Sequence, residues 1–375
     1  MTSDWKELTL GEVTKLVIDY RGKTPKKLGG DWSENGYRAL SAKNIKTGRI
    51  VQPDTIRYID EEMYRKWMKD EVQRGDILIT SEAPFGQIFF WDSDEKIVLS
   101  QRLFCVRIKP EYDARFIYYY MTTPEFQGEL DGRATGTTVV GLRQPELMKC
   151  VIRCPEIQEQ KAIAAILSSI DEKIIANEKI NDNLQQQAQA IYSSMFIDNA
   201  DPEWEQGHLS DLITVKYGKD HKKLADGSYP VYGSGGVMRY VERPLYDKES
   251  VLIPRKGTLN NVMYVNQPFW SVDTMFYTEM RLPNVAKFVY HFVKAKDLAS
   301  MNAGSAVPSM TTDILNAMEV TIPSASALEE FETLVSPLYK AMQENDNQSE
   351  TLAKLRDALL PKLMSGEIDV SDIQL

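Results

Sequence analysis

Two segments, one in each half of the chain, follow one plan. Residues 154–174 read CPEIQEQKAIAAILSSIDEKI, and residues 322–342 read IPSASALEEFETLVSPLYKAM. Each segment begins at a proline and continues into an apolar pattern with helical spacing. A chain that carries the same sequence pattern twice is predicted to be a tandem duplication, because a repeated sequence unit builds a repeated structural unit.

The repeat extends beyond these two segments. Residues 136–195 align with residues 304–363 without a gap, and matches include Leu147 with Leu315 and Pro155 with Pro323. Near the start of each half, Trp5 matches Trp204. These two tryptophans are separated by more residues in the sequence than Pro155 and Pro323 are. The second half is therefore shorter than the first, and the difference lies in the front part of the repeat.

The rear part of each repeat carries a heptad seam, in which apolar positions recur at steps of three, four and seven residues. Such a seam requires a partner helix, and the two copies supply matching seams for an antiparallel pair within one chain. Asn177 in the middle of the seam costs stability but fixes the register. The interface residues predicted on this basis are Ile163, Ile170, Ile174, Asn177, Leu184 and Ile191 in the first copy, and Leu338, Met342, Asn345, Leu352 and Leu359 in the second.

The heptad seams have one other interpretation. Two separate amphipathic helices, each packed on its own domain, are the alternative to a helix pair. The dipeptide Ser336-Pro337 has the form of an N-cap followed by a proline in the first turn, which predicts that the long second helix starts there.

The front part of each repeat predicts mixed α/β structure with short strands. Matching apolar runs occur at 75–80 and 250–255, and again at 103–108 and 274–280. The runs at 116–121 and 287–293 are predicted to be helices that pack on the sheet. The predicted fold class is α/β (α+β), with two pseudo-symmetric globular domains at 1–155 and 200–323 and spacer helix regions at 156–199 and 324–375, whose two long antiparallel helices form a coiled coil.

Several chemical functions are excluded by what the sequence lacks. The start of the sequence, MTSDWKELTL, does not have the pattern of a signal peptide, and no apolar run reaches membrane-spanning length, so we expect a cytoplasmic protein. The three cysteines do not form a disulfide framework or metal knuckle, and the three histidines have no metal-ligand spacing. RGKT at 21–24 fails as a phosphate loop because Val17 stands where glycine is required. We expect no catalytic site and no bound metal.

Charge is distributed unevenly along the chain. The net charge is -10, of which residues 156–200 carry -4 and residues 324–375 carry -6, so the acidic excess lies on the predicted helices. Basic residues gather in loops at 15–49, 216–223 and 255–256, where they suit phosphate groups, with amides beside them that suit base edges. The predicted DNA-binding residues are Arg21, Lys23, Thr24, Lys26, Lys27, Lys43, Asn44, Gln101, Arg102, Lys219, Lys222, Lys223, Arg255, Lys256, Asn260 and Asn261.

These features together resemble the specificity subunit of a type I restriction-modification system. The resemblance covers nearly the whole chain and rests on the order and duplication of its motifs. The motifs are PEIQEQ at 155–160, GTTVVGLRQPEL with its echo GSAVPSMTTDIL, PVYGSGGVMRYV in the second half, and the closing LLPKLMSGEIDV. The second copy departs from the pattern at 324–327, where SASA replaces the acidic and glutamine-rich stretch.

The resemblance implies a fold and a set of partners. It implies two target-recognition domains that each read half of a bipartite double-stranded DNA site, with paired helices that set the gap. It also implies two adenine-N6 methyltransferase subunits and two ATP-driven restriction/translocase subunits as partners. S-adenosylmethionine, ATP and Mg are then expected on those partners and not on this chain.

Three alternatives remain open from the sequence. The chain could be a non-catalytic scaffold that joins proteins through its helices without reading DNA, or the specificity subunit of a related restriction type. An enzyme would need a site that no motif in the sequence signals.

Overall fold

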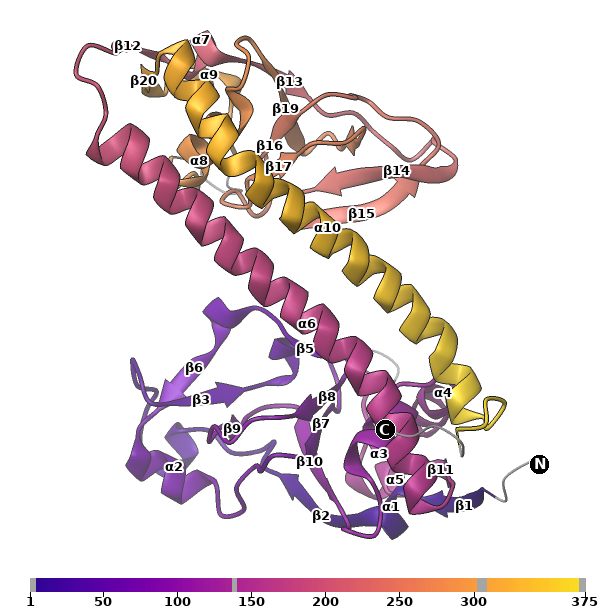
Figure 1. Ribbon diagram of the computed structural model, residues 1–375. Helices are drawn as coiled ribbons and strands as arrows, with labels where there is room; N and C mark the ends of the chain where they lie inside the picture. The colour runs from indigo at the N-terminus through magenta and orange to yellow at the C-terminus, as the bar shows by residue number, and fades with distance from the viewer. Residues whose placement is uncertain (1–4, 137–139, 302–308, 371–375) are drawn as a thin grey trace. The chain divides into compact units, whose positions relative to one another are not determined.

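The computed structural model describes residues 5–136, 140–301 and 309–370 (Figure 1). The chain forms two units: residues 1–175 with 348–375 make unit 1, and residues 176–347 make unit 2. Parts of the repeated motifs GTTVVGLRQPEL and GSAVPSMTTDIL fall at 137–139 and 302–308, outside the described residues. No helix in the three described ranges combines the length and apolar character that crossing a membrane requires.

Unit 1 is built on a four-stranded antiparallel sheet in the order β2-β10-β7-β8. Its strands are β2 (Thr14–Asp19), β10 (Leu103–Ile108), β7 (Asp76–Thr80) and β8 (Ile88–Trp91). The smaller sheets pair β6 (Arg57–Ile59), β3 (Tyr37–Leu40) and β9 (Val98–Leu99), then β1 (Lys6–Thr9) with β11 (Val151–Cys154), and β4 (Ile45–Lys46) with β5 (Arg49–Ile50). The helices before the spacer are α1 (Leu10–Val13), α2 (Glu61–Trp67), α3 (Ala114–Met121), α4 (Pro124–Arg133) and α5 (Gln144–Leu147).

Unit 2 repeats this plan, with a four-stranded sheet in the order β13-β19-β16-β17. Its strands are β13 (Ile213–Tyr217), β19 (Met275–Met280), β16 (Ser250–Pro254) and β17 (Met263–Val265). A second sheet joins β15 (Gly236–Val241), β14 (Asp226–Gly233) and β18 (Trp270–Ser271), and a third joins β12 (Glu205–His208) with β20 (Glu319–Ile322). The short helices are η4 (Ser194–Asp198), α7 (Leu209–Leu212), α8 (Ala286–Lys294) and α9 (Thr312–Asn316).

The predicted duplication and the predicted elements are confirmed. The strands expected at 75–80, 103–108, 250–255 and 274–280 are β7, β10, β16 and β19, and the helices expected at 116–121 and 287–293 are α3 and α8. The connection from β2 to β7 runs over 20–75, whereas the equivalent connection from β13 to β16 covers only 218–249. Most of the difference in length between the halves therefore lies here, where unit 1 has α2 and the β4–β5 hairpin.

The two long helices are α6 (Ile157–Ser193) and α10 (Ala325–Met364), and each contributes one end to each unit. Within unit 2, Asn181 donates from Nδ2 to the Met342 carbonyl at 3.1 Å, and Asn177 donates to the Asn345 carbonyl at 3.3 Å. Within unit 1, Arg356 donates to Asp171 at 2.8 Å. Residue numbers rise on one helix as they fall on the other, so the predicted antiparallel pairing is confirmed.

The predicted seam residues divide between the helix pair and the cores of the units. Ile163 and Leu359 pack into the core of unit 1, and Ile191 and Leu338 pack against the core of unit 2. Ile170 and Asn177 are buried, while Ile174, Leu184, Met342, Asn345 and Leu352 are half-buried. The asparagines form a polar layer in mid-seam, because Asn345 also donates to Asn181 at 2.8 Å.

The predicted start of the second helix at Ser336-Pro337 is wrong. α10 begins at Ala325, after Ser324, whose hydroxyl accepts from the Ala327 amide at 3.3 Å and caps the first turn. Pro337 lies inside the helix, where a missing N–H costs about 3 kcal/mol. Burial of Phe331 and Val335 in the core of unit 2 continues the helix through this position, and such packing outweighs local propensity.

A polar junction joins the core helix of each unit to both long helices. In unit 1, the Tyr119 hydroxyl of α3 donates to Asp171 of α6 at 2.7 Å, and Arg356 of α10 donates to the other oxygen of the same carboxylate. In unit 2, His291 of α8 lies 2.8 Å from Gln189 of α6 and 2.9 Å from the hydroxyl of Tyr339 of α10. Tyr119 and His291 occupy equivalent positions of the repeat, because each follows the start of its preceding strand, β10 or β19, by the same interval.

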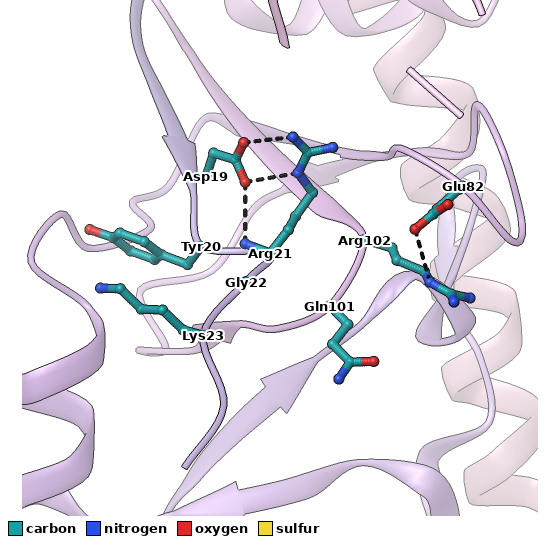
Figure 2. Close-up of a pocket in the computed structure, with 8 residues that line it drawn as sticks. All are labelled: Asp19, Tyr20, Arg21, Gly22, Lys23, Glu82, Gln101 and Arg102. Carbon is teal, nitrogen blue, oxygen red and sulfur yellow. Dashed lines mark hydrogen bonds and ion pairs between the residues drawn. The ribbon is translucent and has the colours of Figure 1, made fainter. Parts of the chain in front are cut away.

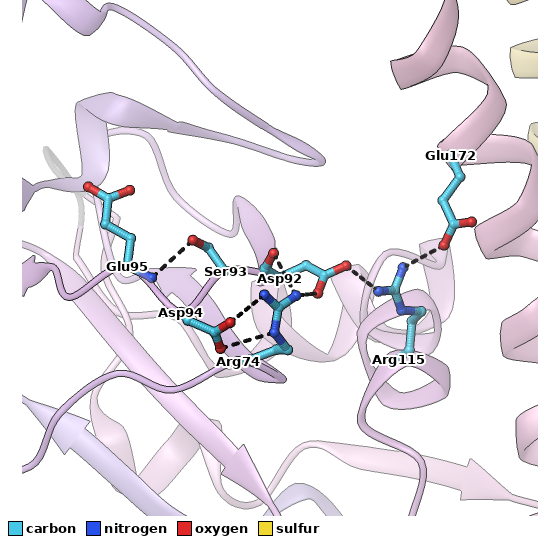
Figure 3. A network of polar contacts seen from close by, with 7 residues as sticks. All are labelled: Arg74, Asp92, Ser93, Asp94, Glu95, Arg115 and Glu172. Carbon is cyan, nitrogen blue, oxygen red and sulfur yellow. Dashed lines mark hydrogen bonds and ion pairs between the residues drawn. The ribbon is translucent and has the colours of Figure 1, made fainter.

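Neighbouring ion pairs add to each junction. Figure 3 shows Arg115 of α3 between Asp92, at 2.6 Å, and Glu172 of α6, at 3.8 Å, while Arg74 binds Asp92 and Asp94. These pairs are largely exposed, so each adds little stability. The equivalent residue in unit 2, Lys287, is buried and bridges Glu249 at 3.2 Å and Glu332 of α10 at 2.6 Å. Loss of one partner in that buried bridge would be costly.

Acidification should destabilise unit 2 through His291. Burial lowers the pKa of His291 from 6.5 to about 4, so the folded protein holds the neutral ring. As the pH falls below 6.5 the unfolded chain takes up this proton first, and stability is lost progressively until about pH 4. At pH 5 the loss is roughly 2 kcal/mol relative to pH 7.5. Urea unfolding of wild type and His291→Gln at both pH values measures it.

The variant should show a smaller change in the free energy of unfolding between the two pH values. His208→Gln, at an exposed position, is the matched control and should keep the wild-type pH dependence. Equal pH dependence in all three proteins would contradict the assignment.

Candidate nucleic-acid interface

One edge of the four-stranded sheet in unit 1 gathers polar residues from three loops. β10 runs antiparallel to both β2 and β7, so the chain leaving β2 and β7 meets the chain entering β10 at the same edge. A pocket of about 590 Å³ lies there (Figure 2). It is lined by Asp19, Tyr20, Arg21, Gly22, Lys23, Glu82, Gln101 and Arg102. Four predicted DNA-binding residues, Arg21, Lys23, Gln101 and Arg102, are brought together in this pocket.

Arg21 is held rigidly in the pocket. Its Nε and Nη2 each donate to Asp19 at 2.8 Å, and its Nη1 donates to the Leu142 carbonyl at 3.3 Å. The guanidinium also lies 3.9 Å from the ring centre of Phe104. An arginine fixed in this way is a preorganised positive charge, because its rotamer is set before any ligand arrives.

Lys23 is also tied to the protein. Its ammonium donates to the Trp67 carbonyl at 2.6 Å and lies 3.9 Å from the ring centre of Tyr20. Burial, followed by the charge of nearby Lys69, lowers the pKa of Lys23 below its usual value. Lys23 contributes charge to the pocket while its geometry is set by internal partners.

Gln101 and Arg102 form the turn that enters β10. Arg102 adopts a left-handed backbone conformation with φ of 65°, which is uncommon for a residue other than glycine. The turn is pinned because the Gln101 carbonyl accepts from Ala42 at 3.1 Å and the Arg102 carbonyl accepts from Ser81 at 2.9 Å. Arg102 pairs with Glu82 through Nε at 3.1 Å, and both Gln101 and Arg102 are exposed.

The remaining predicted residues of unit 1 lie outside this pocket. Thr24 accepts from the Lys27 amide at 3.3 Å, and the Lys27 ammonium donates to the Gly22 carbonyl at 2.8 Å. Lys26 is exposed on η1 (Lys26–Leu28), and Lys43 is exposed on η2 (Ala42–Asn44). These lysines continue the basic surface beside the pocket.

The prediction that Asn44 reads bases is wrong. Its side chain is fully buried. The amide oxygen accepts from the Ser41 amide and hydroxyl, and the nitrogen donates to the Gln52 carbonyl and to Thr55. Asn44 therefore holds the loop that carries Lys43 and cannot also contact a ligand.

Unit 2 has the same loops at the same sheet edge. The Arg255 amide donates to the Thr274 carbonyl at 2.9 Å, as Ser81 donates to Arg102 in unit 1. Arg255 lies 5.4 Å from the ring centre of Tyr217, which in turn packs on Phe276. Lys256 and Glu82 occupy equivalent positions, because each lies the same number of residues after the start of its strand, β16 or β7. An acid in unit 1 is therefore replaced by a base in unit 2.

The other predicted residues of unit 2 divide into exposed lysines and structural amides. Lys219, Lys222 and Lys223 are exposed on the loop from β13 to β14. Asn260 is bonded to Asp297 and to the Ala299 amide, both at 3.0 Å, and Asn261 donates to the Ser234 carbonyl at 2.8 Å. Both asparagines therefore connect loops of unit 2.

The family of the chain is decided by comparison with known proteins. A family model described as the type I restriction modification DNA specificity domain matches residues 2–186 and 202–350. The chain belongs to this family. It is a specificity subunit, which recognises DNA and is not the catalytic subunit of a restriction-modification complex.

Relatives support the assignment along the chain. The type I restriction enzyme MjaIX specificity subunit of Methanocaldococcus jannaschii is 24% identical over 360 residues, covering 84% of this chain and 83% of the relative. The HindI specificity subunit of Haemophilus influenzae is 20% identical over 484 residues, covering 98% and 100%. The crystal structure of the S subunit from M. genitalium is 19% identical with a TM-score of 0.61, covering 96% of each chain, and shares the fold.

The residues that hold the arginines and lysines of this specificity subunit in place were not predicted from its sequence. These residues are acidic or aromatic, namely Asp19, Glu82, Tyr20 and Tyr217, whereas the predicted residues were basic and amide side chains and one threonine. A signal was present in the sequence, because Tyr20 stands between Asp19 and Arg21, and Tyr217 follows Lys216. Aromatic residues interleaved with basic ones mark places where cations can stack.

Replacement of Asn44 should reduce the stability of the specificity subunit and leave base preference unchanged. Asn44→Ala removes a buried amide and leaves its partners without hydrogen bonds, which costs about 1–3 kcal/mol. Urea unfolding measures this loss, and Asn35→Ala, at an exposed position of unit 1, should have little effect. Full stability combined with altered base preference would show that Asn44 contacts DNA after all.

Proposed function

We propose that this specificity subunit reads a bipartite duplex, with each unit contacting one half-site and the paired helices setting the gap between them. The observation that carries the proposal is the repetition of one basic sheet edge in both units. Arg21 and Arg102 occupy it in unit 1, and Arg255 and Lys256 occupy it in unit 2. A duplicated reader suits a ligand with two separate sites.

Lysines and arginines on these loops supply most of the affinity by neutralising phosphates, and exposed polar side chains supply the choice of bases. Lys26, Lys27, Lys43, Lys222 and Lys223 are exposed and serve as phosphate contacts. Gln101 and Arg102 line the pocket, are exposed and serve as base contacts, since glutamine suits adenine and arginine suits guanine.

The proposed partners are two adenine-N6 methyltransferase subunits and two restriction/translocase subunits, all in the cytoplasm. Family membership supports these partners, and so does the charge of the helices. Residues 156–200 and 324–375 carry net charges of -4 and -6, which suit a protein surface better than phosphate. S-adenosylmethionine is proposed to bind the methyltransferase subunits, and ATP and Mg the translocase subunits.

Removal of two lysines should weaken binding to every DNA sequence by a similar factor. Lys26→Ala with Lys27→Ala removes two proposed phosphate contacts, which lowers the slope of log K against log salt concentration by about 1.8. Fluorescence anisotropy of the complex with its methyltransferase at several salt concentrations measures the slope. Lys6→Ala with Lys149→Ala, exposed lysines paired with Glu156 and Glu146, is the matched control and should keep the wild-type slope. An unchanged slope in the first variant would count against the proposed surface.

Lengthening both helices by one heptad should move the two half-sites apart. Duplicating residues 170–176 of α6 and 346–352 of α10 keeps the heptad register and adds about 10.5 Å at ~1.5 Å per residue. At ~3.4 Å per base pair this corresponds to about three base pairs. Methylation of duplexes with spacers lengthened by zero to five base pairs identifies the preferred gap. A well-folded variant that still prefers the original spacer would refute the role of the helices.

A further inference from the structure

An apolar strip is exposed on β15 of unit 2. Val237, Met238 and Tyr240 have 48%, 60% and 42% of their surface exposed. β15 stands at the edge of the sheet in the order β15-β14-β18. Exposed apolar edge strands invite unwanted pairing, so natural proteins keep them for a purpose or cover them.

A β-bulge explains why adjacent residues of the strip are both exposed. In the register of β14 with β15, Tyr232 pairs with Val237 and Val231 pairs with Arg239. Met238 is therefore an extra residue on β15. A bulge interrupts the alternation of a strand and re-aims a side chain, and bulges are common next to functional sites.

In unit 1, β6 stands at the edge of the sheet in the order β6-β3-β9, the place that β15 holds in unit 2. β6 carries a bridge from Tyr58 to Ser33, and Arg57 lies over the ring of Trp32 at 5.2 Å. These residues precede β7, in the part of the repeat that is longer in unit 1. Among the described residues, β15 carries no isolated bridge of this kind, so its exposed strip is available to a ligand.

Basic loops border the strip at both ends. At the hairpin tip, the Ser234 carbonyl accepts from the Asn261 side chain at 2.8 Å. The Ser234 hydroxyl lies close to Gly257, because a Cβ added to that glycine would come within 2.6 Å of the hydroxyl oxygen. Gly257 directly follows Arg255 and Lys256. At the other end, Arg239 donates to the Leu224 carbonyl at 3.0 Å and pairs with the exposed Asp226 at 2.7 Å. Leu224 directly follows the exposed Lys222 and Lys223, so the two lysines outnumber that one carboxylate.

An apolar centre with cations on both sides matches the major groove of duplex DNA. The groove admits a two-stranded β-ribbon, the flanking phosphates attract lysine, and thymine presents a C5-methyl group to apolar side chains. An apolar protein surface would not explain the exposed lysines at both borders. The lysines at both borders thus favour DNA over an apolar protein surface as the occupant.

We propose that the β14–β15 ribbon enters the major groove of the half-site read by unit 2, where Val237 and Met238 contact thymine methyl groups. This inference rests on the proposed function and names the residues of unit 2 that carry its base preference. It needs no hydrogen bond from the strip, since apolar contact alone separates thymine from the other bases at that position.

Deoxyuridine substitution tests the contact directly. The complex with its methyltransferase partner is titrated with duplexes carrying the target mapped by methylation, in which single thymines of either half-site are replaced by deoxyuridine. Wild type should lose about four-fold in affinity for each contacted methyl, the factor expected for burying one methyl group. The loss should be confined to one half-site, the one whose recognition is not altered by Arg102→Ala in unit 1.

The variant Met238→Ala with Val237→Ala should bind the thymine target as weakly as wild type binds the deoxyuridine target, with no further loss on deoxyuridine. A protein with Met238→Leu alone should keep the wild-type sensitivity to deoxyuridine, because leucine is also apolar. Leu282→Ala removes an exposed apolar residue after β19 and is the matched control that should behave as wild type. Equal sensitivity of the double variant and wild type to deoxyuridine would overturn the proposal, as would a half-site without any A·T pair.

Three further outcomes separate the strip from the wider function. Loss of methyltransferase association in size-exclusion chromatography of the double variant would make the strip a protein contact and would also overturn the proposal. If the wild-type complex binds target and random duplex equally, the proposed function itself fails. If the wild-type complex prefers the target over random duplex and the double variant keeps that preference in full, the role of the strip is refuted but the proposed function is not.

Discussion

The polar junction between a short core helix and two antiparallel long helices is the constraint on which each unit depends. Tyr119, Asp171 and Arg356 form it in unit 1, and the equivalent junction in unit 2 uses His291, Tyr339 and Gln189. Each junction fixes the rotation of both long helices against the core helix that packs on the sheet. The sheet edge with its basic loops is therefore held in a set relation to the helix ends of the same unit. One junction is ionic and the other neutral, so the duplication has kept the geometry while the chemistry has changed.

The same divergence marks the sheet edges. In unit 1 the arginines are held by carboxylates, Arg21 by Asp19 and Arg102 by Glu82, so their charge is partly compensated and their directions are set. In unit 2 the position of Glu82 is taken by Lys256, and Arg255 lies over an aromatic ring. Paired arginines favour directional hydrogen bonds, whereas a lysine acts as a point charge that favours phosphate. The two units are thus built alike but carry different charge patterns at this sheet edge.

Much of the fold could be predicted from the sequence, because the patterns that specify its strands and helices are local. The strands at 75–80 and 250–255 and the helices at 116–121 and 287–293 are dense apolar runs, and the heptad seam identified both long helices. The start of α10 was missed, since the packing of Phe331 and Val335 carries the helix through Pro337. Asn44 was misassigned because its burial depends on a turn that closes over it. The pairing of Glu82 with Arg102 could not be predicted, since it requires the register of antiparallel strands.

The distribution of core residues along the chain has a consequence for synthesis on the ribosome. The core of unit 1 contains Leu10 and Val13 together with Leu363, Met364 and Val370. It is not complete until residues 363–370 have been translated, whereas unit 2 uses one continuous stretch, residues 176–347. Domains usually fold as they emerge, the N-terminal part first. Here the reverse order is expected: all residues of unit 2 are translated before those that complete the core of unit 1, so apolar surface of the N-terminal strands stays uncovered until the end of α10 is made.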